Sequence, residues 1–430
     1  MDTTKQKLQG GQLAVWLASQ HHPINFALAA RIRGAVAPEE VQQALDKLRR
    51  KHPPLSVRAA READGNVYLT PDATLKIPAR IVERKHTENW VEEVIAELDR
   101  AFDLRDGPPL RVVLLRGEGI AEVLFVCPHA LADGLAVAYL VRDFLSFLAD
   151  PEADETPGPP ARPMSELIPD FQGKSAAIWR ARLKAKLMKL ALSRTAKAGA
   201  AHADEASQGV AQYHLHPWVL TSEQTAALVA RSRTEGATVH AALCAAFLRA
   251  FGEFHRDGWK RRIQSPVNLR ERLDEPVGKA FGLYVNLVEF PVNCAPERSF
   301  WEVAREIKQG FAHHTADKRI FDALVEANEV MNEVGAIITP QTVARSFIAT
   351  HHDLSISNLG RLDFPAQYGS LRLEALFGPI LGGDPQDIVL GVVTVGGKMH
   401  LCLSCTSLKL DPSQAEQIIT TAMHWLANAT

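Results

Sequence analysis

An imidazole and a carboxylate lie four residues apart in the segment CPHALADG, residues 127–134, as His129 and Asp133. A histidine side chain has a reference pKa of about 6.5, so it is largely neutral at pH 7 and can take a proton from a hydroxyl or an amine. The carboxylate has two open roles: it orients that base directly, or it turns away and pins the loop through an arginine. A structural interpretation is also open, because aspartate before glycine and an apolar helical run is a favourable helix N-cap.

Other familiar catalytic patterns are absent from the sequence. There is no G-x-S-x-G elbow to supply a serine nucleophile, no P-loop, and no strand followed by G-x-G-x-x-G and a helix. Cys127 lies two residues from His129, but apolar surroundings raise rather than lower the pKa of a thiol. Cys402 and Cys405 lie in a strand-like segment without a second ligand pair, so the sequence predicts neither a metal site nor a redox cofactor.

The His-Asp segment is expected at the junction between a strand and a helix. Residues 111–127 form two apolar runs around the Gly-Glu-Gly of residues 117–119, which is typical of a β-hairpin. Residues 135–149 then place apolar side chains at helical spacing. Earlier in the chain, residues 38–55 begin with acidic side chains and later carry basic ones, which favours a helix that ends at Pro53.

Length and composition indicate two domains in a globular chain. A chain of 430 residues is longer than one domain with a single hydrophobic core usually is. Its 46% hydrophobic and 23% charged residues are typical of soluble proteins. A formal net charge of −2 provides no overall positive potential that would attract nucleic acid. No segment resembles a secretory signal, no apolar run reaches the ~20 residues needed to span a bilayer, and an odd number of cysteines, five, suits a reducing compartment. These features predict a cytoplasmic protein.

A change in composition divides the chain into two comparable halves. Residues 150–163 are rich in proline, glycine and acid and are interpreted as a linker. The helix-compatible segment 174–197 has eight lysines and arginines and no acid. Three interpretations of it are open: a solvated crossover helix, a patch for coenzyme A phosphates or an acidic carrier protein, and a peripheral contact with a membrane surface. We expect an N-terminal lobe over residues 1–165, a crossover linker over 166–210 and a C-terminal lobe over 211–430.

Taken in order, several segments resemble the histidine-dependent acyltransferase superfamily, which includes peptide-synthetase condensation domains, chloramphenicol acetyltransferase, and the polyketide-associated and alcohol acyltransferases. Its common element H-x-x-x-D-G is seen here as His129, Asp133 and Gly134. The supporting segments are 26–55 with its His52-Pro53 end, 101–115 before the hairpin, 265–286 with Arg270, Gly282 and Asn286, and 357–360, SNLG. The resemblance spans about residues 12–425, with features of the polyketide-associated and alcohol acyltransferase branch.

The resemblance implies an α/β (α+β) fold of two chloramphenicol-acetyltransferase-like lobes, which form a V-shaped cleft with a tunnel at their interface. It implies that His129 is the general base. It also implies that Asp133 points away from the tunnel and pairs with Arg270, with Arg272 as the rival partner two residues on. Gly134 would let the backbone approach the substrate closely, and its alternative is an ordinary glycine at a helix start.

Donors for a developing oxyanion are expected in a late loop with the sequence SISNLG. Ser355, Ser357 and Asn358 are the candidate oxyanion or substrate contacts, although backbone N–H groups can do this alone. Their alternative is turn chemistry, because serine, asparagine and glycine are turn residues. One position departs from the pattern: many relatives have a second histidine directly before the catalytic one, and this chain has Pro128. The catalytic histidine itself is kept.

The resemblance implies an enzyme that moves an acyl group to an alcohol from a thioester, carried by coenzyme A or by the phosphopantetheine of an acyl carrier protein. The thioester is a substrate, and neither a bound cofactor nor a metal is implied. Two alternatives stay open: an amide-forming condensation enzyme with an amine acceptor, and a non-catalytic module that docks carrier proteins. Degenerate modules of the last kind typically lose the motif, whereas His129, Asp133 and Gly134 are all present.

Overall fold

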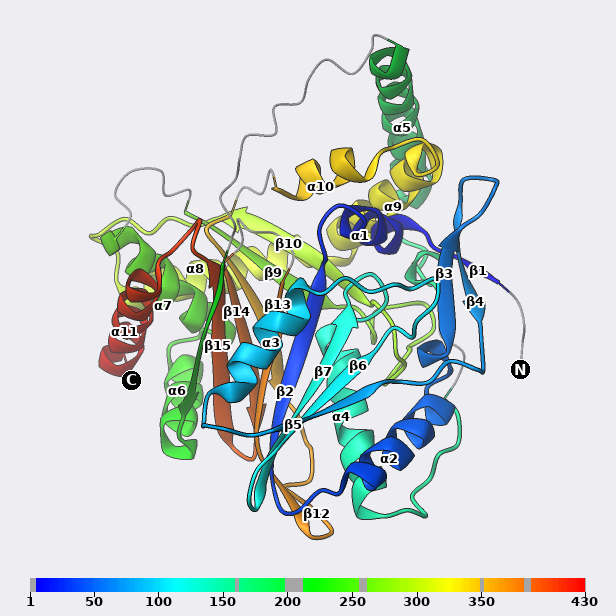
Figure 1. Ribbon diagram of the computed structural model, residues 1–430. Helices are drawn as coiled ribbons and strands as arrows, with labels where there is room; N and C mark the ends of the chain where they lie inside the picture. The colour runs from blue at the N-terminus through cyan, green and yellow to red at the C-terminus, as the bar shows by residue number, and fades with distance from the viewer. Residues whose placement is uncertain are drawn as a thin grey trace.

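The chain folds around two six-stranded sheets that stand side by side (Figure 1). The structure is a computed structural model and describes residues 5–158, 162–197, 212–254, 261–348, 352–382 and 388–429. The first sheet has the order β12-β13-β2-β7-β6-β5, in which only β5 and β6 are parallel. Its strands are β2 (Asn25–Arg33), β5 (Ala79–Glu83), β6 (Arg111–Arg116), β7 (Ile120–Pro128), β12 (Gln367–Tyr368) and β13 (Leu371–Leu381).

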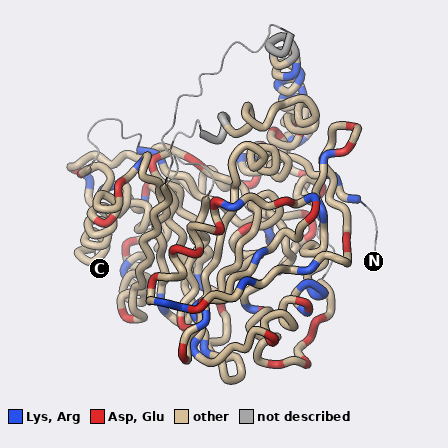
Figure 2. The backbone as a smooth tube through the Cα atoms, in the orientation of Figure 1, with Lys and Arg blue, Asp and Glu red and all other residues tan. Residues whose placement is uncertain are grey.

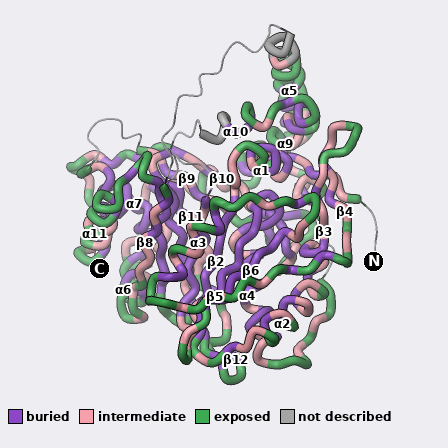
Figure 3. The backbone as a smooth tube through the Cα atoms, viewed as in Figure 1, coloured by how far each residue is buried: buried purple, intermediate pink, exposed green. Residues whose placement is uncertain are grey.

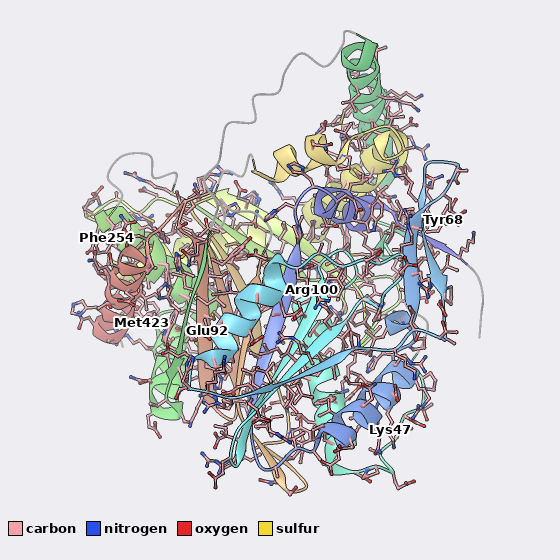
Figure 4. The ribbon with its side chains drawn as sticks, in the orientation of Figure 1. Lys47, Tyr68, Glu92, Arg100, Phe254 and Met423 are labelled. Atoms are coloured by element: carbon pink, nitrogen blue, oxygen red, sulfur yellow. The ribbon has the colours of Figure 1, made fainter. Side chains whose placement is uncertain are left out.

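Alternating side chains of β2 bury both faces of the first sheet. Phe26 and Leu28 point into the core shared with α2 (Pro38–Lys51) and α4 (Gly134–Ala149), whereas Ala27 and Ala29 point into the core under α3 (Asn89–Asp99). Successive side chains of a strand point to opposite faces, so a continuous run of buried apolar residues is typical of a strand covered on both faces. Lys47 of α2 lies over the ring of Phe147 of α4 at 5.8 Å, where these two helices pack (Figure 4).

The second sheet has the order β10-β9-β11-β14-β15-β8, in which β11 runs parallel to both of its neighbours. Helices α7, α8 and α11 pack on one another and share a core with this sheet. The strands are β8 (Tyr213–Leu220), β9 (Arg262–Asn268), β10 (Val285–Pro291), β11 (Leu354–Arg361), β14 (Val389–Val395) and β15 (Lys398–Thr406). The helices of this half are α6 (Ser222–Thr234), α7 (Val239–Phe254), α8 (Phe300–His314) and α11 (Pro412–Ala429).

A late segment of the chain crosses back to complete the first sheet. Residues 367–381, within the range expected for the C-terminal lobe, form β12 and β13, and β13 pairs with β2. A sequence pattern carries no information on which strands pair, so this crossing was not expected. β13 also contacts β14, so closely that a Cβ at Gly391 would lie 2.2 Å from the carbonyl oxygen of Pro379. The expected limits at 165 and 210 stay a prediction.

A smaller layer joins the N-terminal segment to helices from the second half of the chain. This layer includes the third sheet, β1-β4-β3. The core of this layer also includes Ala130 and Leu131 from the His-Asp segment. Its elements are β1 (Gln6–Lys7), α1 (Gly10–Ser19), the 3₁₀ helix η1 (Pro53–Leu55), β3 (Val57–Arg61), β4 (Val67–Pro71), the 3₁₀ helix η2 (Met164–Glu166), α5 (Lys174–Lys197), α9 (Asp317–Val334) and α10 (Pro340–Ile348).

Several sequence expectations are confirmed by these elements. Residues 111–127 form the antiparallel hairpin of β6 and β7, α2 ends before Pro53, and residues 174–197 form the helix α5. The mixed α/β fold with two comparable sheets is also confirmed, whereas the V-shaped cleft and its tunnel stay predictions. Figure 3 shows that the strands of both sheets are largely buried, while α5 is largely exposed. No helix in the described part of the chain is long and apolar enough to cross a membrane.

Candidate functional site

His129 lies directly after the end of β7. The last paired residue of that strand is Pro128, which lies opposite Asn25 of β2, and the His129 N–H donates to the carbonyl oxygen of Ile24 at 2.9 Å. The pairing of β7 with β6 ends earlier, at Val126. Proline is therefore tolerated at the position where many relatives have a second histidine, because its missing N–H interrupts no bond to β6.

The imidazole of His129 is held in one tautomer. Its Nδ1 lies 3.0 Å from the carbonyl oxygen of Ala132. A carbonyl oxygen only accepts, so Nδ1 carries the proton and Nε2 of the neutral ring keeps its lone pair. No hydrogen bond from the described residues reaches Nε2. The ring is tilted by 55° against Phe26, at a centroid distance of 5.1 Å.

The surroundings of His129 favour the neutral ring. Burial among protein atoms lowers its pKa below the ordinary value, and this effect outweighs the opposing influences of the Ala132 carbonyl and the Asp133 carboxylate. The residue nevertheless keeps partial solvent exposure. A neutral, partly accessible imidazole with a free lone pair has the properties of a general base at pH 7.

Asp133 makes no hydrogen bond to His129 and instead ties the start of α4 to the second half of the chain. Its Oδ1 accepts from the N–H of Ala136, so Asp133 is the N-cap of α4. Its Oδ2 accepts from Nη1 of Arg270 at 2.6 Å and from the N–H of Tyr284 at 2.8 Å. Of the two roles left open by the sequence, this geometry favours the one in which the carboxylate turns away and fixes the loop.

Arg270 and Asp133 form a deeply buried ion pair, with each residue only 1% exposed. Nη2 of Arg270 also lies 3.2 Å from the carbonyl oxygen of Ala280, and its guanidinium lies over the Tyr284 ring at 5.0 Å. The rival Arg272 points elsewhere and pairs with Asp317 at 2.5 Å. The loop between β9 and β10 thereby reaches from the second sheet to the His-Asp segment.

Gly134 lies where a side chain would clash with two neighbouring strands. A Cβ at this position would lie 2.4 Å from Cγ of Pro379 on β13 and 2.9 Å from Cδ2 of Leu359 on β11. These distances are well below van der Waals contact, so a side chain here would force the Pro379 ring and the Leu359 side chain to move. Gly134 thus permits the close packing of α4 against both sheets, and its expected role in substrate approach stays a prediction.

The segment SISNLG is a strand, β11, and not the late loop expected from the sequence. The strand forms because its apolar residues alternate: Leu354 and Ile356 are buried in the core beside α7, which leaves Ser355 and Ser357 on the other face. Leu359 continues that second face and lies beside Gly134, so this face of β11 approaches the His-Asp segment.

The three candidate contacts on β11 differ in how far they are already engaged. Ser355 donates from Oγ to Oε1 of Gln264 at 3.3 Å. Asn358 accepts from the N–H of Gly360 at 2.8 Å, next to a shift in the register of the strand, which is the turn chemistry left open by the sequence. Ser357 is partly exposed, and no side-chain hydrogen bond to the described residues is found for it.

Two groups that hold this site were missed by sequence reasoning. The carbonyl oxygen of Ala132 fixes the tautomer of His129, and it is a backbone group that no residue pattern reveals. Tyr284 supplies a backbone N–H and a ring to the ion pair, and a Cβ at Gly282 would lie 2.5 Å from that ring. The Gly-x-Tyr spacing could have indicated such a close approach.

Other reactive side chains are poor candidates for chemistry. Burial raises the pKa of the Cys127 thiol well above its ordinary value, and the five cysteines are free and buried. Burial lowers the pKa of His240 to about 4, and its Nε2 lies 3.1 Å from Oγ of the buried Ser265. No group of three or more His, Cys, Asp or Glu residues suited to a metal ion is found among the described residues.

Solved structures share this fold over nearly the whole chain. Polyketide synthase associated protein 5 from Mycobacterium tuberculosis aligns with a TM-score of 0.66 at 16% identity, covering 99% of this chain and 100% of that one. Trichothecene 15-O-acetyltransferase TRI3 from Fusarium sporotrichioides aligns with a TM-score of 0.71 at 12% identity, covering 99% and 95%. The first condensation domain of the calcium-dependent antibiotic synthetase aligns with a TM-score of 0.69 at 15% identity, covering 99% and 97%.

Sequence relatives include both stand-alone transferases and parts of large synthetases. The phthiocerol/phthiodiolone dimycocerosyl transferase of Mycobacterium ulcerans is 25% identical over 319 residues, which are 71% of this chain and 72% of that protein. Phosphinothricin tripeptide synthetase PhsC of Streptomyces viridochromogenes is 24% identical over 344 residues, 74% of this chain, but the match spans only 30% of the synthetase. Residues 6–360 match the condensation domain family. Because this match covers most of the chain, including the His-Asp segment and the Arg270 loop, the protein belongs to the condensation domain family.

Proposed function

We propose that the protein is an acyltransferase in which His129 is the general base and an alcohol is the acceptor. Nε2 accepts the proton of the hydroxyl as the oxygen attacks the thioester carbonyl carbon. The tetrahedral intermediate then collapses, the C–S bond breaks, and the imidazolium returns the proton to the departing sulfur. The observation that carries this proposal is the Nδ1 contact with the Ala132 carbonyl at 3.0 Å, because it leaves the lone pair on Nε2.

The second face of β11 is the proposed source of oxyanion stabilisation. Ser357 is the best placed of the three candidates, because Ser355 and Asn358 are already engaged in hydrogen bonds within the chain. A hydroxyl or backbone N–H directed at the oxygen of the tetrahedral intermediate stabilises charge that is absent from the ground state. The proposed tunnel would bring the thioester and the acceptor to His129 from opposite sides.

The donor is proposed to be an acyl thioester of coenzyme A or of a carrier-protein phosphopantetheine. An amine acceptor is the second candidate, because the chain is 24% identical to part of a tripeptide synthetase, whose product contains peptide bonds. The alcohol is favoured because the dimycocerosyl transferase is named for phthiocerol and phthiodiolone, which are alcohols by name. The match covers 72% of that protein, which is similar in length to this chain. Both reactions use the same base and the same thioester, so the site geometry alone supports either.

A screen of donors against acceptors tests this proposal. Purified protein is incubated with a series of acyl-CoA and carrier-bound thioesters, together with matched alcohol and amine acceptors of the same carbon skeleton. We expect ester products, detected by mass spectrometry, that increase with protein concentration and exceed the amides. Amides in excess would replace the alcohol by the amine as acceptor. Thioesters left unconsumed by folded protein with every donor would contradict an enzymatic role.

A further inference from the structure

Helix α5 carries a row of large apolar side chains exposed to solvent. Trp179 is 66% exposed, Leu183 47% and Leu187 61%. These residues are four positions apart, so they lie within about 80° on one face of a helix and along roughly 12 Å of its length. Three large apolar residues in a row on one exposed face differ from the scattered exposed residues that any surface has.

The opposite face of α5 attaches the helix to the protein. Ala177, Ala181 and Ala185 are buried, and these small residues let α5 pack closely along α9. Ion pairs strengthen this attachment, among them Arg182 with Glu329 at 2.8 Å and Lys189 with Glu333 at 3.3 Å. The apolar row therefore faces away from the body, on a helix that projects beyond both sheets (Figure 1).

Basic side chains border the apolar row on both sides. Arg180 and Lys184 lie on one side of it and Arg182 and Lys189 on the other, by the helical rotation of 100° per residue. Residues 174–192 include six lysines and arginines and no acid, while the adjoining α9 has five acids and two bases, so the two helices keep an excess of positive charge (Figure 2). Exposed ion pairs are weak, so these cations can exchange a carboxylate for another anion.

Charge, sequence and size argue against three other coverings of this row. A second copy packed through the same face would bring basic borders against basic borders. The chain's own segment 198–211, AGAAHADEASQGVA, contains one large aliphatic residue, Val210, and so offers little apolar area to cover a tryptophan and two leucines. A protein partner needs an interface of about 800 Å² per side, which a single projecting helix provides poorly.

We propose that α5 docks the protein on an anionic lipid surface. The apolar row of Trp179, Leu183 and Leu187 inserts among the lipid headgroups, and the helix lies in the plane of the interface. The long stems of the bordering lysines and arginines let their charged ends reach lipid phosphates. Tryptophan is the residue best suited to the boundary between headgroups and acyl chains. This docking is independent of the acyl-transfer chemistry at His129.

Vesicle sedimentation tests this docking. Phosphatidylcholine vesicles with or without phosphatidylglycerol are mixed with the full chain at low and high salt. We expect binding to the anionic vesicles that weakens with salt, and a loss of at least about tenfold when Trp179, Leu183 and Leu187 are all changed to serine. The matched control changes Leu287 and Leu408, which are 50% and 38% exposed on other surfaces, to serine and should bind as the unchanged protein does.

A second measurement reports direct contact. Brominated lipids in the same vesicles should quench the tryptophan emission of the unchanged protein, and Trp179→Phe should bind but lose most of that quenching. All variants should keep their melting temperature and their turnover of water-soluble substrates, because the changed side chains are exposed. Vesicle binding that is absent at low salt, or equal in the triple variant, would overturn the proposal. Self-association that is lost in the triple variant, without vesicle binding, would also overturn it and assign the face to a second copy.

Discussion

Replacement of His129 by alanine is expected to lower kcat by about 10²–10⁴-fold without unfolding the protein. The ring is partly exposed and contributes one hydrogen bond, to the Ala132 carbonyl, so its removal costs little stability. Its Nε2 is the proposed acceptor of the proton from the substrate hydroxyl, so the variant lacks the base. Steady-state kinetics with the best donor and acceptor pair measure the effect.

The matched control is His216→Ala. His216 lies on β8, at the edge of the second sheet, and burial also lowers its pKa. This variant should keep the kcat of the unchanged protein within about twofold. A folded His129→Ala protein that retains most of its activity would exclude His129 as the base, whatever the control does.

The largest expected effect on stability comes from breaking the buried ion pair. Arg270→Met and Asp133→Asn should each lower the free energy of unfolding by about 3–5 kcal/mol, because each leaves one buried group without its charged partner. The loss with Asp133→Asn includes the weaker N-cap of α4. The double variant should lose less than the sum of the two, since neither charge is then stranded. Chemical denaturation of the unchanged protein, the two single variants and the double variant measures these free energies of unfolding.

Arg272→Met is the control for the ion pair. Its partner Asp317 is 75% exposed in its side chain, so we expect a loss of at most about 1 kcal/mol. A small loss for Arg270→Met as well, equal to that of the control, would contradict the structural role of the pair. A shifted pH dependence of the rate for Asp133→Asn with unchanged stability would mean instead that the carboxylate orients the base.

Local patterns in the sequence were sufficient to predict the elements that hold His129. The two apolar runs around residues 117–119 predicted the hairpin of β6 and β7, and the spacing after Gly134 predicted α4. Both depend on contacts between near neighbours in the chain. The choice of Arg270 as the partner of Asp133 came from the family resemblance instead, because the two residues lie 137 positions apart.

Features that depend on tertiary packing were not predictable from the sequence. The family resemblance indicated a late loop at SISNLG, but burial of Leu354 and Ile356 beside α7 forms the strand β11 instead. The pairing of β13 with β2 and the close contact of Gly134 with Pro379 both follow from how the two sheets meet. A sequence pattern identifies a strand but not its neighbour.

The pH dependence of kcat/KM tests most directly whether the neutral imidazole of His129 is the base. Burial lowers its pKa, and only the neutral ring can accept a proton, so activity should fall as the pH drops through a midpoint below about 6.5. The residual rate of His129→Ala should lack this acid limb. A midpoint above 6.5, or the same limb in His129→Ala, would contradict the account.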